Sequence, residues 1–443
     1  MNMTQNQVGR TMTGAFVAVT SLFFMWGFIT VLVDALIPRL KEVFELTFLQ
    51  AGLVQFAWFA AYGLLSIPGG NLISRIGYQR GILVGLALAG LGCLLFFPAA
   101  STRLYPLFLL ALFVVAGGIT VLQVAANPYI SVLGPESSAS SRLNLSQAFN
   151  SVGTTLAPLV AASFLLGDQI LSSDEIGALS QEDRLAYFAS EASAVQGPFV
   201  GLALAFFALA GIVATIQLPK ILGGTESRQA SYASVFQNAK LRFGAIAIFV
   251  YVGAEVALGS YMVNYGMSLD VVDAIQEHGA LRWMANVAAA LKGVELVNLD
   301  AKGILGALLT LYWGGAMVGR FVGSALMRSI APAKLLGASA LAAAVLIVGS
   351  VLSGGISALM LTLAVGFFNS IMFPTIFTLA IEDLGEAKPQ GSGVLCTAIV
   401  GGAFIPPAVG ALVDSLGFGW AFLLPAVCYL YISWYGGRLV PSA

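Results

Sequence analysis

Charged residues are scarce in this chain. They make up 9% of its 443 residues, whereas soluble domains carry about 25%. Hydrophobic residues make up 58%, so the composition excludes an ordinary soluble domain and indicates an integral membrane protein. The net charge of −1 excludes a strongly basic surface, and no nucleic-acid partner is expected.

Residues with catalytic or metal-binding chemistry are equally scarce. The single histidine, His278, falls in a predicted loop, where an ordinary exposed side chain is expected. The three cysteines, Cys93, Cys396 and Cys428, fall in apolar segments, where a thiol is usually a small buried hydrophobe. The sequence contains no Ser-His-Asp set, nucleotide motif or metal-ligand spacing inside its apolar segments. We therefore expect a protein that is not an enzyme and holds no cofactor.

Long apolar runs, by contrast, recur along the chain. A helix of about 20 apolar residues crosses a bilayer, and the continuously apolar character of these runs favours helices over alternating barrel strands. Twelve spans are predicted, at 14–37, 48–73, 80–99, 105–132, 143–166, 197–217, 243–267, 304–327, 333–353, 356–382, 391–414 and 418–437. The expected fold class is an all-α membrane protein.

Basic residues are unevenly shared between the two sides of these spans. If the N-terminus is cytoplasmic, twelve basic residues lie on that side and seven on the other. Both termini are then cytoplasmic by the positive-inside rule. The first span lacks a small-residue cleavage site, so it is expected to be retained and not removed as a signal peptide.

The two halves of the chain share a weak internal sequence repeat. The segment GNLISRIGYQR at 70–80 parallels GSALMRSIAPAK at 323–334. Three more positions recur at nearly equal intervals, pairing Pro128 with Pro374, Gly153 with Gly401 and Pro158 with Pro406. We expect two pseudo-symmetric six-helix bundles, at 1–217 and 243–443, joined by a cytoplasmic linker at 218–242. Such symmetry is typical of transporters whose halves rock around a central site.

Three ionisable residues lie inside predicted spans. An ionised carboxylate at the centre of a span costs roughly 2.5–3.5 kcal/mol on insertion scales, so Asp34 and Glu255 are functional candidates by default. Asp34 is the candidate for cation coupling, with Thr30 and Gln123 as neighbours that could complete a Na⁺ shell. Arg320 is expected to reach the headgroups or to pair with an acid at an inner gate.

Polar amides in otherwise apolar spans are the main substrate candidates. Gln123 and Asn127 are four residues apart, and Gln147 and Asn150 three apart, so each pair shares a helix face. Two such faces could converge on one cavity and bind the polar groups of a ligand. The open alternative is that these amides only tie helices together.

The second half supplies further candidates of the same kind. They are Glu255, Asn264, Tyr265, Trp313 and Asn369. Aromatic rings could stack on an apolar face of the same ligand. For Trp26, Trp58 and Trp313 the alternative is an interfacial belt or simple packing.

Several segments together resemble one transporter family. In the first half they are FFMWGFITVLVDALIP at 23–38, QVAANPYISVLGPESS at 123–138 and RLNLSQAFNSVGTTLAP at 142–158. In the second half they are YVGAEVALGSYMVNY at 251–265, YWGGAMVGRFVGS at 312–324 and NSIMFPTIFTLAIEDLG at 369–385. Over nearly its whole length the chain resembles the major facilitator superfamily, and within it the fucose, galactose and glucose:cation symporter family.

The resemblance implies roles for individual residues. It implies that Asp34 takes part in cation coupling. The proton-coupled fucose carriers have a glutamate in span four, where this chain has Gln123, and an amide in span seven, where it has Glu255. This pattern is similar to the glucose and galactose branch. The superfamily's loop motif between spans two and three departs from the usual pattern, since Ser74 stands where aspartate is usual.

From these observations we expect a secondary active transporter that imports a hexose, first of all glucose or galactose, with Na⁺ or H⁺ by alternating access. The expected setting is the inner membrane of a bacterium, with a functional monomer in the lipid bilayer. Two alternatives stay open: an uncoupled sugar facilitator, and a membrane sugar sensor, which the lack of a sizeable soluble domain after Trp434 disfavours. The sequence does not choose between the hexoses or between the two cations.

Overall fold

The computed structural model describes residues 5–43, 48–165, 173–216, 218–219, 231–291 and 294–440, and all regular structure in these ranges is helical. The first half contains α1 Gln5–Val43, α2 Phe48–Ile76, α3 Tyr78–Thr102, α4 Tyr105–Val132, α5 Ala139–Leu165, α6 Ser173–Ala178 and α7 Gln181–Thr215. The second half begins with α8 Tyr232–Val235, α9 Ala239–Ser268, α10 Val272–Glu277, α11 Gly279–Ala290, α12 Ala301–Leu326 and α13 Pro332–Leu352. It ends with α14 Gly355–Asn369, α15 Met372–Ile381, α16 Lys388–Thr397, α17 Gly401–Leu416, α18 Phe418–Ala421 and α19 Leu423–Arg438. Four 3₁₀ turns join these helices, at Glu136–Ser138, Leu296–Asn298, Glu382–Ala387 and Ala398–Val400.

The twelve predicted spans are confirmed. Ten stretches of the described chain are long and apolar enough to cross a membrane, and one of them, Gly355–Leu416, is 62 residues long and comprises two spans. The remaining span is α5, whose first turns carry the polar residues Ser140, Ser141 and Asn144. These polar residues face the other half of the protein and not lipid, as shown below.

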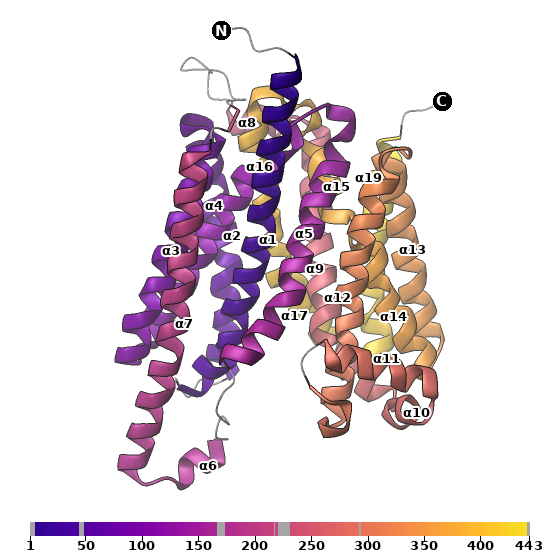
Figure 1. The fold of residues 1–443 in the computed structure, drawn as a ribbon. Coiled ribbons are helices and arrows are strands. Elements are labelled where there is room, and N and C mark those ends of the chain that lie inside the picture. Colours follow the sequence, from indigo (N-terminus) through magenta and orange to yellow (C-terminus); the bar gives the residue numbers. More distant parts are fainter. Residues whose placement is uncertain are drawn as a thin grey trace.

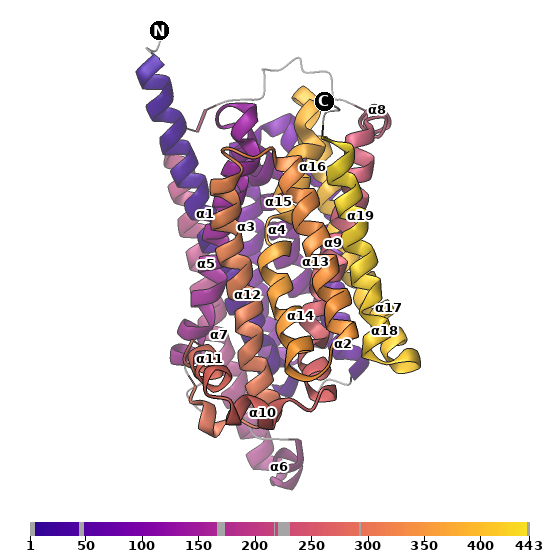
Figure 2. The same ribbon diagram turned by 90° about the vertical axis from the view of Figure 1, so that its right-hand side faces the viewer.

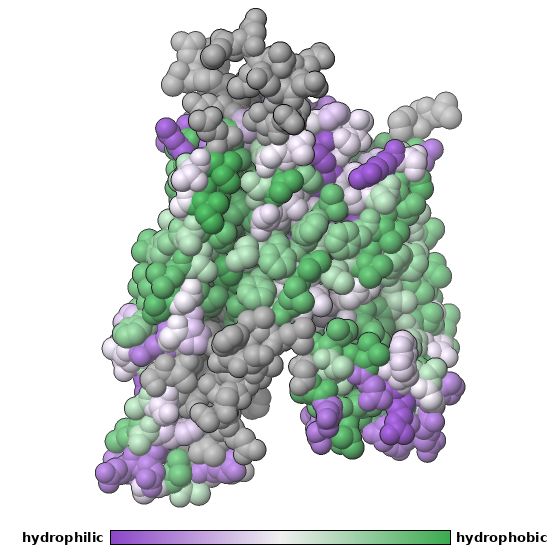
Figure 3. Space-filling model, in the orientation of Figure 1, coloured by the Kyte–Doolittle hydropathy of each residue, from purple (hydrophilic) through white to green (hydrophobic). Residues whose placement is uncertain are grey.

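The helices gather into two groups, α1–α7 and α9–α19 (Figure 1). Both chain ends lie at the same end of the molecule, which we call the terminal end, and the two groups diverge toward the opposite end (Figures 1 and 2). On the face shown in Figure 3, a broad hydrophobic band crosses the middle of the molecule, with hydrophilic residues toward both ends. Of the predicted linker at 218–242, residues 220–230 lie outside the described residues, and the rest includes α8 and the start of α9.

The repeated glycines mark equivalent helix crossings in the two halves. A methyl group on Gly153 of α5 would overlap the carbonyl oxygen of Phe24 on α1, and one on Gly401 of α17 would overlap that of Phe249 on α9. Only glycine allows backbones to approach so closely. The two close helix crossings therefore depend on Gly153 and Gly401, which the internal repeat pairs with each other.

The structure also departs from the predicted boundaries. Helix α7 begins at Gln181, sixteen residues before the predicted start of span six at 197, and its first turn is capped by Ser180, which accepts from the Asp183 amide at 3.2 Å. The stretch 268–303, predicted as a loop, contains α10 and α11. Both helices are too short to span a membrane, so a search for runs of about 20 apolar residues could not find them.

Candidate functional site

A cavity of about 240 Å³ lies between the two helix groups near the middle of the spans. Its lining combines polar and aromatic side chains from both halves of the chain. Eight of its residues were singled out from sequence: Trp26, Thr30, Trp58, Gln123, Gln147, Asn150, Glu255 and Arg320. The convergence predicted for the two amide faces is thus seen for three of the four amides.

The first half lines the cavity with amides held by the protein. The Gln123 amide nitrogen donates to the Tyr62 hydroxyl at 2.5 Å, and the Asn150 amide nitrogen donates to the Phe23 carbonyl at 2.9 Å. Each bond fixes the nitrogen end of its amide. The carbonyl ends of Gln123 and Asn150 are then oriented acceptors for a ligand hydroxyl.

The second half contributes the carboxylate. The Tyr251 hydroxyl, one turn earlier on α9, donates to Glu255 Oε1 at 2.7 Å. No base among the described residues forms a salt bridge with Glu255. The carboxylate therefore keeps acceptor capacity for a ligand inside the cavity.

Arg320 lies elsewhere than the sequence suggested. Its guanidinium neither reaches the headgroups nor pairs with an acid: Nε donates to the Ser370 carbonyl at 3.1 Å, and Nη1 donates to the Ser151 hydroxyl and, at 3.4 Å, to the Gln147 carbonyl. The first acceptor belongs to its own half, and the other two lie on α5. The side chain therefore joins the two halves beside the cavity.

Proline creates the acceptor that holds Arg320. Pro374 has no amide hydrogen, so the carbonyl of Ser370, four residues earlier, lacks the bond that a helix would give it. Arg320 supplies that bond. The paired position behaves in the same way, because Pro128 frees the carbonyl of Val124, which accepts from the Ser392 hydroxyl of α16 at 2.9 Å.

Several predicted substrate residues do not line the cavity. Asn369 is buried behind it and donates to the hydroxyls of Tyr312 at 2.6 Å and Tyr429 at 3.2 Å. Asn127 is also buried, and its carbonyl oxygen accepts from Gln147 at 3.5 Å. Both amides tie helices together in this conformation, which was the alternative stated for Asn127.

The remaining candidates do not line the cavity among the described residues. Asn264 is exposed on α9, and Trp313 is 44% exposed on α12 beside Gly259. The Tyr265 hydroxyl is bonded to Ser350 at 3.0 Å. Asp34 lies on α1, four residues after Thr30, but its side chain lies outside the described residues, so its coupling role stays a prediction.

Sequence reasoning missed other residues of the lining. Tyr62, Thr154, Tyr251 and Phe373 all line the cavity. Tyr251 could have been found, because a tyrosine four residues before an intramembrane glutamate shares its helix face. Nothing in the sequence marks Tyr62, whose contact with Gln123 depends on how α2 packs against α4.

A polar seam closes the interface between the cavity and the terminal end. Polar residues of α5 recur every three or four positions and face α12 and α15. They are Ser140, Ser141, Asn144, Gln147 and Ser151. The Ser140 hydroxyl bonds that of Thr378 at 2.6 Å, the Ser141 hydroxyl donates to the Ser324 carbonyl at 2.7 Å, and the Asn144 amide donates to Thr375 at 3.1 Å.

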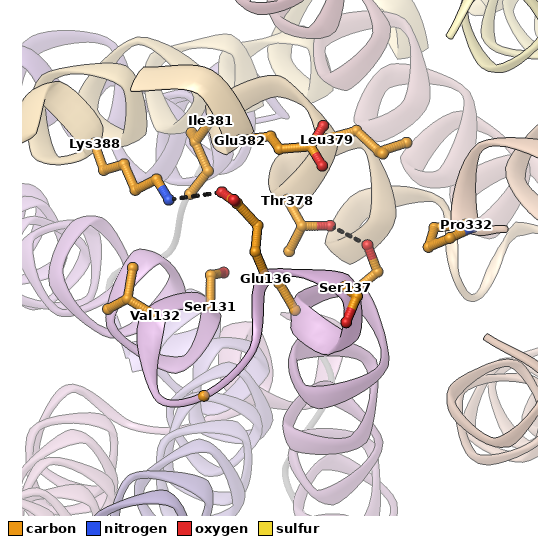
Figure 4. Close-up of a pocket in the computed structure, with 13 residues that line it drawn as sticks. Ser131, Val132, Glu136, Ser137, Pro332, Thr378, Leu379, Ile381, Glu382 and Lys388 are labelled. Carbon is orange, nitrogen blue, oxygen red and sulfur yellow. Dashed lines mark hydrogen bonds and ion pairs between the residues drawn. The ribbon is translucent and has the colours of Figure 1, made fainter. Parts of the chain in front are cut away.

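At the outer edge of this seam lies a second cavity, of about 430 Å³ (Figure 4). Lys388 reaches across it to Glu136 at 3.3 Å. The Glu136 side chain is 59% exposed, so the ion pair is worth about 0–1 kcal/mol. The Ser140 and Thr378 hydroxyls of the seam also line this cavity.

Tyr232, at the start of the second half, also joins the halves at this end. Its hydroxyl donates to the Ile67 carbonyl of α2 at 2.7 Å and lies against Gly70 and Gly393, where α2 meets α16. Burial raises the pKa of Tyr232 to about 12, so the phenol remains a donor at physiological pH.

Comparisons with known proteins agree with this geometry. The model of the Major Facilitator Superfamily matches residues 12–399. The chain is 47% identical over 423 residues to a glucose/galactose transporter of Brucella abortus, covering 95% of this chain and 93% of that protein. It is 35% identical over 425 residues to the L-fucose-proton symporter of Escherichia coli, covering 94% and 91%. A crystal structure of a Major Facilitator Superfamily transporter, FucP, in the outward conformation matches with a TM-score of 0.84 at 33% identity, covering 96% and 99% of the two chains.

Proposed function

The chain belongs to the Major Facilitator Superfamily, and from that premise we propose that it imports a hexose together with a cation by alternating access. Glucose or galactose is the first choice, because the relative at 47% identity is named for these sugars. The observation that carries the proposal is the cavity between the halves, which presents amides from one half and a carboxylate from the other.

The size and lining of the cavity suit a single sugar ring. Ligand pockets usually measure about 300–1,000 Å³, and a cavity of about 240 Å³ lies just below that range. Hydroxyls need partners that accept and donate, which Gln123, Asn150 and Glu255 supply, while Trp26 and Trp58 offer rings for the C–H face. A ligand touching both walls favours the state in which the walls approach.

The position of the seam indicates at which end of the molecule the cavity is open. The hydrogen bonds between the halves given above lie at the terminal end or at the level of the cavity. A ligand therefore reaches the cavity from the opposite end. If both termini are cytoplasmic, as the positive-inside rule predicts, the structure faces outward. Import then requires the seam to part and the opposite end to close.

For coupling we assign the decisive charge to Asp34. A bare carboxylate in a closing, poorly hydrated interface is unfavourable, and H⁺ or Na⁺ neutralises it and permits the closure. Thr30, one turn earlier on α1, lines the cavity. Gln123 cannot titrate, so a proton mechanism would depend on Asp34 or on Glu255.

The test is counterflow in proteoliposomes with a panel of hexoses, repeated with and without Na⁺ at fixed pH. The proposal predicts exchange of glucose or galactose, and faster uptake when a Na⁺ or H⁺ gradient is imposed. A protein that exchanges none of the hexoses would contradict it.

An uncoupled facilitator is the second candidate, and Gln123 favours it because an amide replaces a titrating group at the cavity. Counterflow is expected for both candidates. Accumulation above the external concentration in sealed vesicles, driven by an ion gradient, distinguishes the coupled carrier.

A further inference from the structure

Helix α11, Gly279–Ala290, lies outside the twelve spans. It follows the end of α9 and precedes the start of α12, at the end of the molecule away from the termini. Its axis runs across the direction of the spans, in contrast to every long helix around it (Figures 1 and 2). A helix in this position lies near the level at which α9 and α12 leave the membrane.

The side chains of α11 divide into three faces. Ala285, Ala288 and Ala289 are fully buried and form the face that packs on the protein. With 3.6 residues per turn, the exposed remainder separates into two stripes of residues four apart. One stripe is polar, Arg282 and Asn286.

The other exposed stripe is apolar and large. Trp283 is 66% exposed, Val287 37% and Leu291 42%. Val294 and Val297, in the segment that leads to α12, are 42% and 85% exposed and extend it. In the space-filling view, hydrophobic atoms gather at the lower end of the second half, where α11 lies, with a hydrophilic rim below them (Figure 3).

From this division we propose that α11 is an interfacial helix, with its apolar stripe inserted at the headgroup–acyl boundary of the leaflet opposite the termini. A helix that lies in the membrane plane needs one apolar and one polar side. A tryptophan at its centre suits the interface, because the ring is apolar and its N–H reaches water. The polar stripe then faces water, and Arg282 lies within reach of lipid phosphates.

The arrangement favours lipid over a protein partner. The protein-facing side of α11 is already filled by its alanines. Its apolar stripe lies at the end of the apolar band of the spans, which lipid covers. The helix would thereby hold the end of α12 away from the termini at a fixed depth in the membrane while the two halves move. This role does not depend on which sugar is carried.

The experiment is site-directed spin labelling of the full chain in vesicles of phosphatidylcholine and phosphatidylglycerol. Single cysteines are placed at Val287 and Leu291, and matched controls at Arg282 and Asn286. The three native cysteines are buried, and labelling of the unmodified protein measures their background. Collision with oxygen, which concentrates in lipid, is compared with collision with a water-soluble nickel chelate.

The proposal predicts that labels at Val287 and Leu291 collide with oxygen as a lipid-facing label at Val345 of α13 does, and that labels at Arg282 and Asn286 collide with the nickel chelate. Equal nickel access at all four positions would overturn the proposal, since the whole helix would then lie in water. Protection of Val287 and Leu291 from both reagents would also overturn it, because protein would then cover the stripe.

Discussion

Arg320 offers the most quantitative test of how the halves are held together. Arg320→Met keeps much of the apolar stem but removes the bonds to Ser151 and to the Gln147 carbonyl, both of which cross between the halves. A hydrogen bond to a charged group contributes about 1.5–3 kcal/mol, and the bond to Gln147 is long at 3.4 Å. Losing these two hydrogen bonds should destabilise the outward-facing state relative to the inward-facing state by about 1.4–3 kcal/mol. The ratio of the outward-facing to the inward-facing population then falls by about 10- to 150-fold.

The population can be measured as a distance distribution. Spin labels at Leu104 and Leu352, which are 55% and 82% exposed and lie at the start of α4 and the end of α13 away from the termini, report whether that end is open. Arg320→Met should convert a mainly long distance into a mainly short one. Ser151→Ala removes one acceptor and should shift the ratio by about 3- to 15-fold.

The double variant provides the control. Because Arg320 and Ser151 share one bond, their effects on the ratio should not add. Strict additivity, or a distance distribution in Arg320→Met identical to that of the wild type, would refute the assignment of Arg320 to the seam.

Three further outcomes are expected. Glu255→Ala should weaken hexose binding by isothermal titration by about 10- to 100-fold, because a charged hydrogen-bond partner is lost; wild-type affinity would remove Glu255 from the site. Asn369→Leu should lower the free energy of unfolding by about 1–3 kcal/mol, since the buried Tyr312 hydroxyl loses its partner, while hexose affinity stays within about twofold; a large loss of affinity at unchanged stability would place Asn369 in the site instead. Lys388→Met should change the outward-to-inward ratio by less than about fivefold, and less at high salt, because its partner Glu136 is exposed; a change above about thirtyfold would show that the ion pair dominates the seam.

Much of the architecture could be read from the sequence because lipid imposes simple rules. A span must be long, apolar and helical, and twelve such runs were present. Residues paired by the internal repeat also have equivalent structural roles. Gly153 and Gly401 each allow a close helix crossing, and Pro128 and Pro374 each leave a backbone carbonyl without its helical donor.

The cavity was predicted less completely, for reasons of packing. Spacing along one helix places Gln147 and Asn150 on the same face, but it does not predict which face of the helix is turned toward the cavity. Asn369 and Asn127 satisfy the same polar pattern and are turned toward other helices. Tyr62 enters the site only through the packing of α2 against α4, which no local pattern encodes.

The partners of Arg320 were not predicted because two of them are backbone carbonyls and the third is a serine hydroxyl, not an acid. A search for acids near a buried base misses a carbonyl that Pro374 leaves without its helical donor. The chemistry of proline does predict such a free carbonyl, so intramembrane prolines deserve to be examined as sources of acceptors.

The central claim is that a cation bound at Asp34 permits the loaded carrier to close around a hexose. It is tested most directly by uptake in sealed proteoliposomes of wild type and Asp34→Asn under an imposed Na⁺ or H⁺ gradient. The account predicts that the wild type accumulates glucose or galactose above the external concentration, while Asp34→Asn loses accumulation and retains part of its exchange. Equal accumulation by both proteins would contradict it.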